Sequence, residues 1–134
     1  MADIIVVATA VVKYDGAETA QGIAGEAITA GMTLYKHTDG KLYKALADTA
    51  LHAACVGVAL NGGAASQPIV YLTSGGLNPG VAVTVGEVYG VTDTAGGISL
   101  ISERGSGDFI TTLGIATTTS RINVNIDKSG AEMA

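Results

Sequence analysis

Residues 28–45 read ITAGMTLYKHTDGKLYKA, and residues 83–102, VTVGEVYGVTDTAGGISLIS, repeat their layout. In each stretch a glycine leads into an apolar segment, a turn follows, and a second apolar segment returns. The pairs Asp39-Gly40 and Gly96-Gly97 supply the positive φ angles that tight hairpin turns require. Each stretch therefore predicts a β-hairpin, with strands at residues 32–35 and 42–45 in the first copy and 88–91 and 98–101 in the second.

The repeat continues beyond the hairpins. Gly57-Val58-Ala59 has a counterpart in Gly114-Ile115-Ala116, and each copy then enters another β-prone segment, at residues 69–72 and 122–126. The later segment, INVNI, alternates apolar and polar residues as a strand with one buried face should. One repeat is thus expected to hold about four short strands.

Four strands with one apolar face cannot bury that face alone, whereas two such units can share a core. The sequence therefore predicts an all-β fold, a compact small β-sandwich or barrel built from two pseudo-repeats of short strands, with an N-terminal strand or arm. The expected division is residues 1–21 for the arm and 22–134 for a single β domain, with pseudo-repeats at about 26–74 and 81–127. Residues 46–54 could form a helical turn capped by Asp48.

Composition and charge indicate a single domain and argue against a nucleic-acid partner. At 134 residues the chain fits one domain. Its net charge is -5 and its seven basic residues are scattered, so no nucleic-acid partner is expected. The start carries Asp3 where a secretory signal would carry a basic residue, so it is interpreted as part of the mature protein.

A long uncharged stretch runs from Thr49 to Gly86. Turn residues divide it into pieces too short to cross a membrane as a helix, so no membrane partner is expected either. The single cysteine, Cys55, excludes an internal disulfide and fits a reducing compartment such as the cytoplasm.

Residues that could carry chemistry are few. The histidines are His37 and His52, and His52 and Cys55 have a spacing that two metal ligands could use, but no further His or Cys completes a zinc site. The glycine-rich pieces at residues 62–66 and 105–108 lack the lysine and the following helix of a phosphate-binding loop. We expect no enzyme activity, no catalytic residues, no metal and no cofactor.

The remaining candidates concern assembly. Residues 4–12, IIVVATAVV, form a β-prone segment that either pairs at the edge of its own sheet or adds a strand to a neighbouring chain. A second candidate is the uncharged loop at residues 61–67. The predicted assembly contacts are Ile4, Ile5, Val6, Val7, Asn61, Gly62 and Gly63.

Three stretches carry a family resemblance: GEAITAGMTLYKHTDGKLYKA at residues 25–45, VGVALNG at 56–62, and SGDFITTLGIATTTSRINVNI at 106–126. Across residues 22–127 this layout resembles the small head decoration, or cement, proteins of tailed bacteriophages. Related layouts occur in other virion proteins. The shorter stretch GIAGEAITAGMTLY, residues 22–35, is similar to the opening strands of SAF-type β-clip domains, which bind sugars or support enzymes.

The resemblance implies a structural virion protein, made in the host cytoplasm, that binds the outer surface of a phage head. It would bind as a homo-oligomer, commonly a trimer, and tie neighbouring subunits of the major capsid protein together. Two alternatives remain. A receptor- or glycan-binding virion module would need an exposed aromatic platform, and a β-clip-type enzyme-associated domain would need His37 or His52 beside a carboxylate in a cleft.

Overall fold

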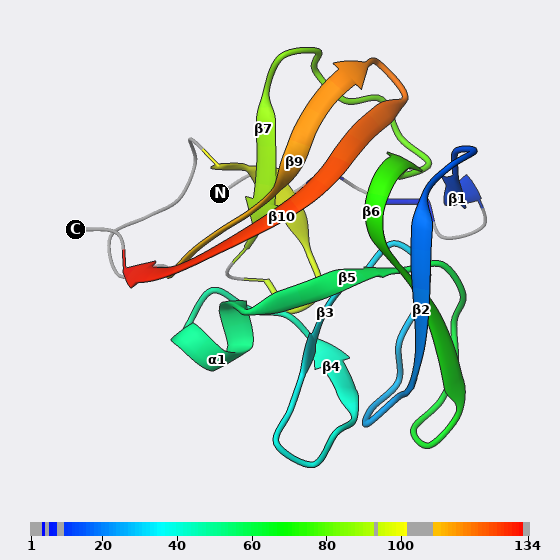
Figure 1. The fold of residues 1–134 in the computed structure, drawn as a ribbon, viewed down its shortest axis with the longest axis vertical. Coiled ribbons are helices and arrows are strands. Elements are labelled where there is room, and N and C mark those ends of the chain that lie inside the picture. Colours follow the sequence, from blue (N-terminus) through cyan, green and yellow to red (C-terminus); the bar gives the residue numbers. More distant parts are fainter. Residues whose placement is uncertain (1–3, 5, 8–9, 93, 102–108, 133–134) are drawn as a thin grey trace.

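The computed structural model describes residues 4, 6–7, 10–92, 94–101 and 109–132. In these residues the chain forms ten β-strands and one short helix (Figure 1). In chain order they are β1 (Val12–Lys13), β2 (Glu18–Ile23), β3 (Thr33–Lys36), β4 (Leu42–Lys44), α1 (Ala50–Ala53), β5 (Cys55–Ala59), β6 (Pro68–Asn78), β7 (Val88–Val91), β8 (Ile98–Leu100), β9 (Phe109–Thr118) and β10 (Arg121–Glu132).

The strands form a single curled sheet of antiparallel pairs. Its order is β4-β3-β5-β6-β10-β9-β7-β8, and β1 and β2 pair with the far edge of β6. The second half of this order mirrors the first, with β7, β8, β9 and β10 in the places of β3, β4, β5 and β6. The all-β fold built from two pseudo-repeats is therefore confirmed, and its form is one curled sheet.

The two halves agree in register as well as in order. Leu34 lies opposite Gly57 in the first half, as Tyr89 lies opposite Gly114 in the second, and the pairing then shifts at the same place in both. An equivalent backbone hydrogen bond fixes the start of each hairpin. The N–H of Gly31 donates to the carbonyl of Ala59 at 2.7 Å, and that of Gly86 to Ala116 at 2.8 Å.

Pairing of β6 with β10 joins the halves. Ser74 of β6 lies opposite Asn125 of β10, and the two residues hold equivalent positions in their halves. The pair therefore marks an approximate twofold axis, and Figure 1 shows these long strands crossing the middle of the molecule. Duplication explains why a short chain repeats its layout: each half supplies one wall of a common core.

The buried side chains form two clusters against the curled sheet. One lies within the first half, where the end of β2 curls round to β4: Ala24 forms a parallel bridge with Leu42, and the N–H of Gly25 donates to the Leu42 carbonyl at 2.8 Å. This smaller cluster consists of Ala24, Ile28, Leu34, Leu42, Ala59, Ile69 and Tyr71. The larger cluster draws on both halves and includes Val58, Leu72, Leu77, Val91, Ile98, Leu113 and Ile122.

The N-terminal segment completes the second half. The N–H of Ile4 donates to the carbonyl of Ile98 on β8 at 2.8 Å. This bond occupies the position that the Gly25 bond to Leu42 occupies on β4. The arm thus contacts the edge of β8 within its own chain at Ile4, and β1 adds a short strand to β6.

The helical turn expected at residues 46–54 is present as α1, but its cap differs from the prediction. Thr49 is the N-cap, and its hydroxyl accepts from the N–H of His52 at 3.1 Å. Asp48 instead contacts the imidazole of His52. No helix in the described part of the chain is long and apolar enough to cross a membrane.

The equivalent glycines 57 and 114 predict a matched loss of stability. A Cβ at Gly57 would meet the backbone carbonyl of Leu72, and one at Gly114 would meet that of Asn123. Backbone in a paired strand cannot move aside as a side chain can, so Gly57→Ala and Gly114→Ala should each lower the free energy of unfolding by about 3 kcal/mol. Urea denaturation measures this.

Gly16→Ala is the control. Gly16 has a φ of 84°, and its Cβ would meet open space. This variant should lose about 1 kcal/mol, from backbone conformation alone. Equal losses in all three variants would show that close strand approach is not what requires glycine at positions 57 and 114.

Candidate functional site

The structure places the predicted arm residues against their own domain. Ile4 and Val6 are half-buried and pack on the larger core cluster. Val7 is 45% exposed, so of the described residues in this predicted set, Ile4, Val6 and Val7, it is the best placed to meet another molecule. Ile5 lies outside the described residues.

The predicted loop at residues 61–67 is a folded turn between β5 and β6. The side-chain oxygen of Asn61 accepts from the N–H of Val70 at 2.7 Å, and its amide nitrogen donates to the Pro68 carbonyl at 3.3 Å. Gly63 exchanges two backbone bonds of 2.9 Å with Ile28. Asn61 and Gly63 therefore shape the loop, and Asn61 and Gly62 remain on the surface.

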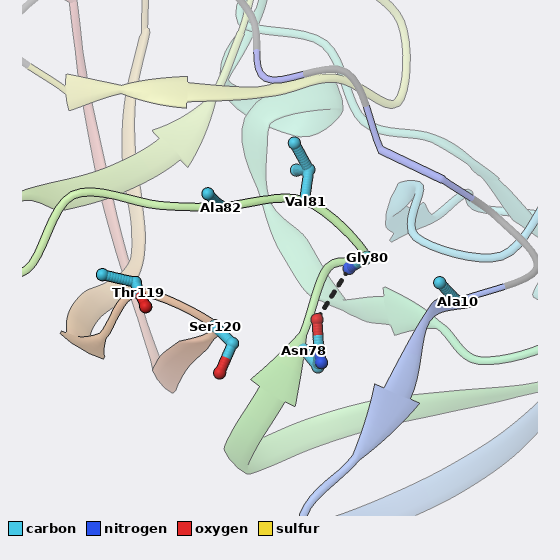
Figure 2. Close-up of a pocket in the computed structure, with 7 residues that line it drawn as sticks. All are labelled: Ala10, Asn78, Gly80, Val81, Ala82, Thr119 and Ser120. Atoms are coloured by element: carbon cyan, nitrogen blue, oxygen red, sulfur yellow. Dashed lines mark hydrogen bonds between the residues drawn. The ribbon is translucent and has the colours of Figure 1, made fainter.

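A shallow hollow of about 370 Å³ opens beside the arm (Figure 2). The segment after β6 crosses it, the β9–β10 turn borders one side and the N-terminal segment borders the other. Its lining is Ala10, Asn78, Gly80, Val81, Ala82, Thr119 and Ser120. Val12, which is 51% exposed, lies opposite Asn78 in the sheet and extends this apolar surface.

The hollow is suited to contact more than to catalysis. None of its lining residues carries an ionisable side chain. The side-chain oxygen of Asn78 already accepts from the N–H of Gly80 at 2.9 Å. Beside the hollow, the hydroxyl of Tyr14 donates to the Ser120 carbonyl at 3.1 Å. This bond connects the β9–β10 turn to the residue that follows β1. A small apolar side chain of another protein would fit such a surface.

A second feature, which we call the aromatic–histidine patch, lies on the first hairpin and α1. It consists of Tyr35 and His37 from β3 and the residue after it, Tyr43 from β4, and His52 from α1. Tyr35 lies opposite Tyr43, with ring centroids 5.9 Å apart and planes at 30°. His52 tilts over Tyr35 at 5.1 Å, and His37 meets the edge of Tyr43 at 5.5 Å.

Carboxylates fix the polar ends of this patch. The hydroxyl of Tyr43 donates to Asp39 at 2.7 Å, and Nδ1 of His52 lies 2.7 Å from a carboxylate oxygen of Asp48. Burial raises the pKa of Tyr35, and the charges of Glu26, Asp48 and Asp39 raise it further. The bond to Asp39 likewise raises the pKa of Tyr43. Both tyrosines therefore remain neutral hydrogen-bond donors at physiological pH.

The second half does not repeat the patch. The pair Tyr35 and Tyr43 corresponds to Gly90 and Ser99, and His37 corresponds to Thr92. Those counterparts are buried, because the second hairpin is covered by the first half. The repeated fold therefore does not itself require aromatic residues at these positions.

Both histidines lie outside the hollow of Figure 2. His52 lies within bonding reach of Asp48, yet the two side chains are 34% and 48% exposed, and the hollow of Figure 2 is lined by other residues. Among the described residues, no group of three or more His, Cys, Asp or Glu side chains could hold a metal ion. Cys55 is buried, and its thiol donates to the Gly57 carbonyl at 3.3 Å.

Sequence analysis did not identify the patch. The sequence does contain a signal for three of its residues. In YKH, residues 35–37, and KLY, residues 41–43, side chains alternate between the two faces of a hairpin that turns at Asp39-Gly40. This alternation puts Tyr35, His37 and Tyr43 on one face. The contribution of His52 could not be foreseen, because it depends on where α1 packs.

Comparison of the chain with protein-family models finds no matching family, and comparison with curated proteins finds no match.

The Asp39 contact predicts a local pH dependence. The N–H of Lys41 and, to a lesser extent, the hydroxyl of Tyr43 lower the pKa of Asp39 below 3.8. Because the folded-state pKa is the lower one, ionised Asp39 stabilises the hairpin above the ordinary carboxylate pKa, and this contribution is lost as pH falls through the folded-state value.

Tyr43→Phe should therefore raise the pKa of Asp39 part of the way to its ordinary value, since the Lys41 bond remains. An NMR titration of the side-chain carboxyl carbon measures the shift. Tyr14→Phe removes a hydroxyl elsewhere and should leave Asp39 unchanged. An unaltered Asp39 pKa in Tyr43→Phe would contradict the assigned bond.

Proposed function

We propose that the protein binds the outer surface of a tailed-phage head and stabilises the lattice of the major capsid protein by multivalent contacts. The observation that carries the proposal is the apolar surface formed by the hollow of Figure 2 with Val7, whose backbone lies against Gly80, and Val12, which lies opposite Asn78. Exposed valines beside a recess without ionisable side chains favour protein contact over chemistry.

The charge of the molecule is compatible with that location. With a net charge of -5, the protein would be repelled by packaged DNA and is better placed outside the shell than lining it. The fold is compatible too, because the N-terminal segment bonds and packs within its own chain, through the Ile4 bond to Ile98 and the pairing of β1 with β6.

The mechanism would be avidity. One copy contributes a small contact of modest affinity, whereas a trimer that touches several capsid subunits makes its later contacts at high effective concentration. Internal pressure would then have to break several contacts together before neighbouring capsid subunits separate.

The direct test mixes the purified protein with mature heads that lack it. Sedimentation measures binding, and the temperature at which the heads release DNA measures stabilisation. The proposal requires saturable binding and a higher release temperature. Absence of binding, or binding that leaves the release temperature unchanged, contradicts it.

Val7→Asp and Val12→Asp locate the contact surface. Each puts a charge on an apolar surface that would become buried, so each should weaken binding to heads by at least about tenfold. Ile23→Asp is the matched control, because Ile23 is 43% exposed at the end of β2, away from the hollow. Thermal unfolding of each variant checks that the fold persists, and equal effects at all three sites would rule out this surface.

A further inference from the structure

The aromatic–histidine patch has no part in the contact surface of the preceding proposal. It lies on the first hairpin and α1, in the lower part of Figure 1, whereas β1 lies at the right, above the middle. Its tip is free: a Cβ at Gly40 would meet nothing within 4 Å. In the second half, by contrast, the N–H of Gly96 donates to the Ala45 carbonyl, and a Cβ at Gly96 would meet Met32.

Negative charge surrounds the rings. Glu26, Asp39 and Asp48 all act on Tyr35. Lys41 already acts on Asp39, and the N–H of Lys44 donates to Glu26 at 3.0 Å. Asp48 is different, since one of its oxygens contacts His52 and the side chain is about half exposed. It is the carboxylate best placed to meet a cation from outside.

The shape of the patch selects the kind of cation. The rings pack against one another with centroids 5.1 to 6.0 Å apart and planes inclined by 30 to 63°, so they present half-buried ring faces at several angles and leave no enclosed cage between them. A compact ammonium gains most from a cage, whereas a planar guanidinium stacks on an exposed ring and pairs its N–H groups with a nearby carboxylate.

The same chain contains an example of this geometry. The guanidinium carbon of Arg121 lies 4.9 Å from the centre of the Tyr14 ring. A Tyr ring beside β1 thus accepts an arginine from β10, which lies on the other side of β6.

We propose that the aromatic–histidine patch binds an arginine side chain presented by a partner protein, with the guanidinium stacked against the half-buried rings of the patch and paired with Asp48. The second half folds alike without these rings, and the patch combines aromatic surface with a half-exposed carboxylate. The ligand is defined by its chemistry and does not depend on binding to heads.

The experiment is an NMR titration of the isolated protein with N-acetyl-arginine amide, with N-acetyl-lysine amide and a panel of neutral monosaccharides as separate arms. The arginine compound should give saturable amide shifts confined to the first hairpin and α1. The lysine compound should bind about tenfold more weakly, because it cannot stack or pair in the same way.

Two variants test the named contacts. Asp48→Asn removes the paired charge, and Tyr43→Leu keeps apolar bulk while removing the ring; each should weaken arginine binding at least about fivefold. Asp15→Asn removes an exposed carboxylate in the β1–β2 turn and should leave binding unchanged. Because Tyr43 packs on Gly25, amide spectra of each variant check that the hairpin is intact.

Saturable arginine binding that both variants weaken supports the proposal. Equal affinity for arginine and lysine, saturation by a monosaccharide instead of arginine, or no saturable shift with arginine would each overturn it. The titration uses no capsid component, so its failure is separate from a failure to bind heads.

Discussion

Antiparallel pairing between β6 and β10 is the constraint on which the rest of the molecule depends. Each half of the sheet has one apolar face, and half of the chain cannot cover that face alone. Where Ser74 meets Asn125, the two halves are held so that their apolar faces curl round one larger core. Every other element is positioned by reference to that junction.

Equivalence of the halves in register does not extend to their surfaces. The second hairpin is buried beneath the first half, and its counterpart positions hold Gly90, Thr92 and Ser99. The first hairpin exposes its tip, residues 38–41, and carries tyrosine and histidine at the equivalent positions. Duplication thus produced one hairpin constrained by packing and another whose outer face is open to contact with other molecules.

Most of the fold could be predicted from the sequence because its signals are local. Positive-φ glycines at the turns and period-two alternation identify hairpins, and the repeat identifies their number. Features that depend on contacts between distant parts of the chain were harder to predict from the sequence. The extension of β6 to Asn78 is hidden by Gly75 and Gly76, which interrupt the apolar pattern, and the covering of β8 by Ile4 depends on a contact between distant parts of the chain.

The candidate sites also divide into features that the local sequence predicts and features that depend on long-range packing. Val7 was named from the apolar run in the arm, whereas the hollow beside it forms from three separate segments and leaves no mark in any one of them. Thr49 displaced Asp48 as the cap of α1 because Asp48 contacts His52 instead. That exchange put a carboxylate beside the aromatic rings, a result of packing that residue spacing alone does not encode.

The bond from Ile4 to Ile98 also has a kinetic consequence. The arm is synthesised before β8, yet the strand to which Ile4 bonds is made only after the whole first half. The first half can close its own smaller cluster early, while the larger core must wait for distant segments to meet, and such contacts slow folding. During synthesis the arm is therefore a β-prone segment without its partner, and at high concentration it could pair with β8 of another molecule before its own has been made.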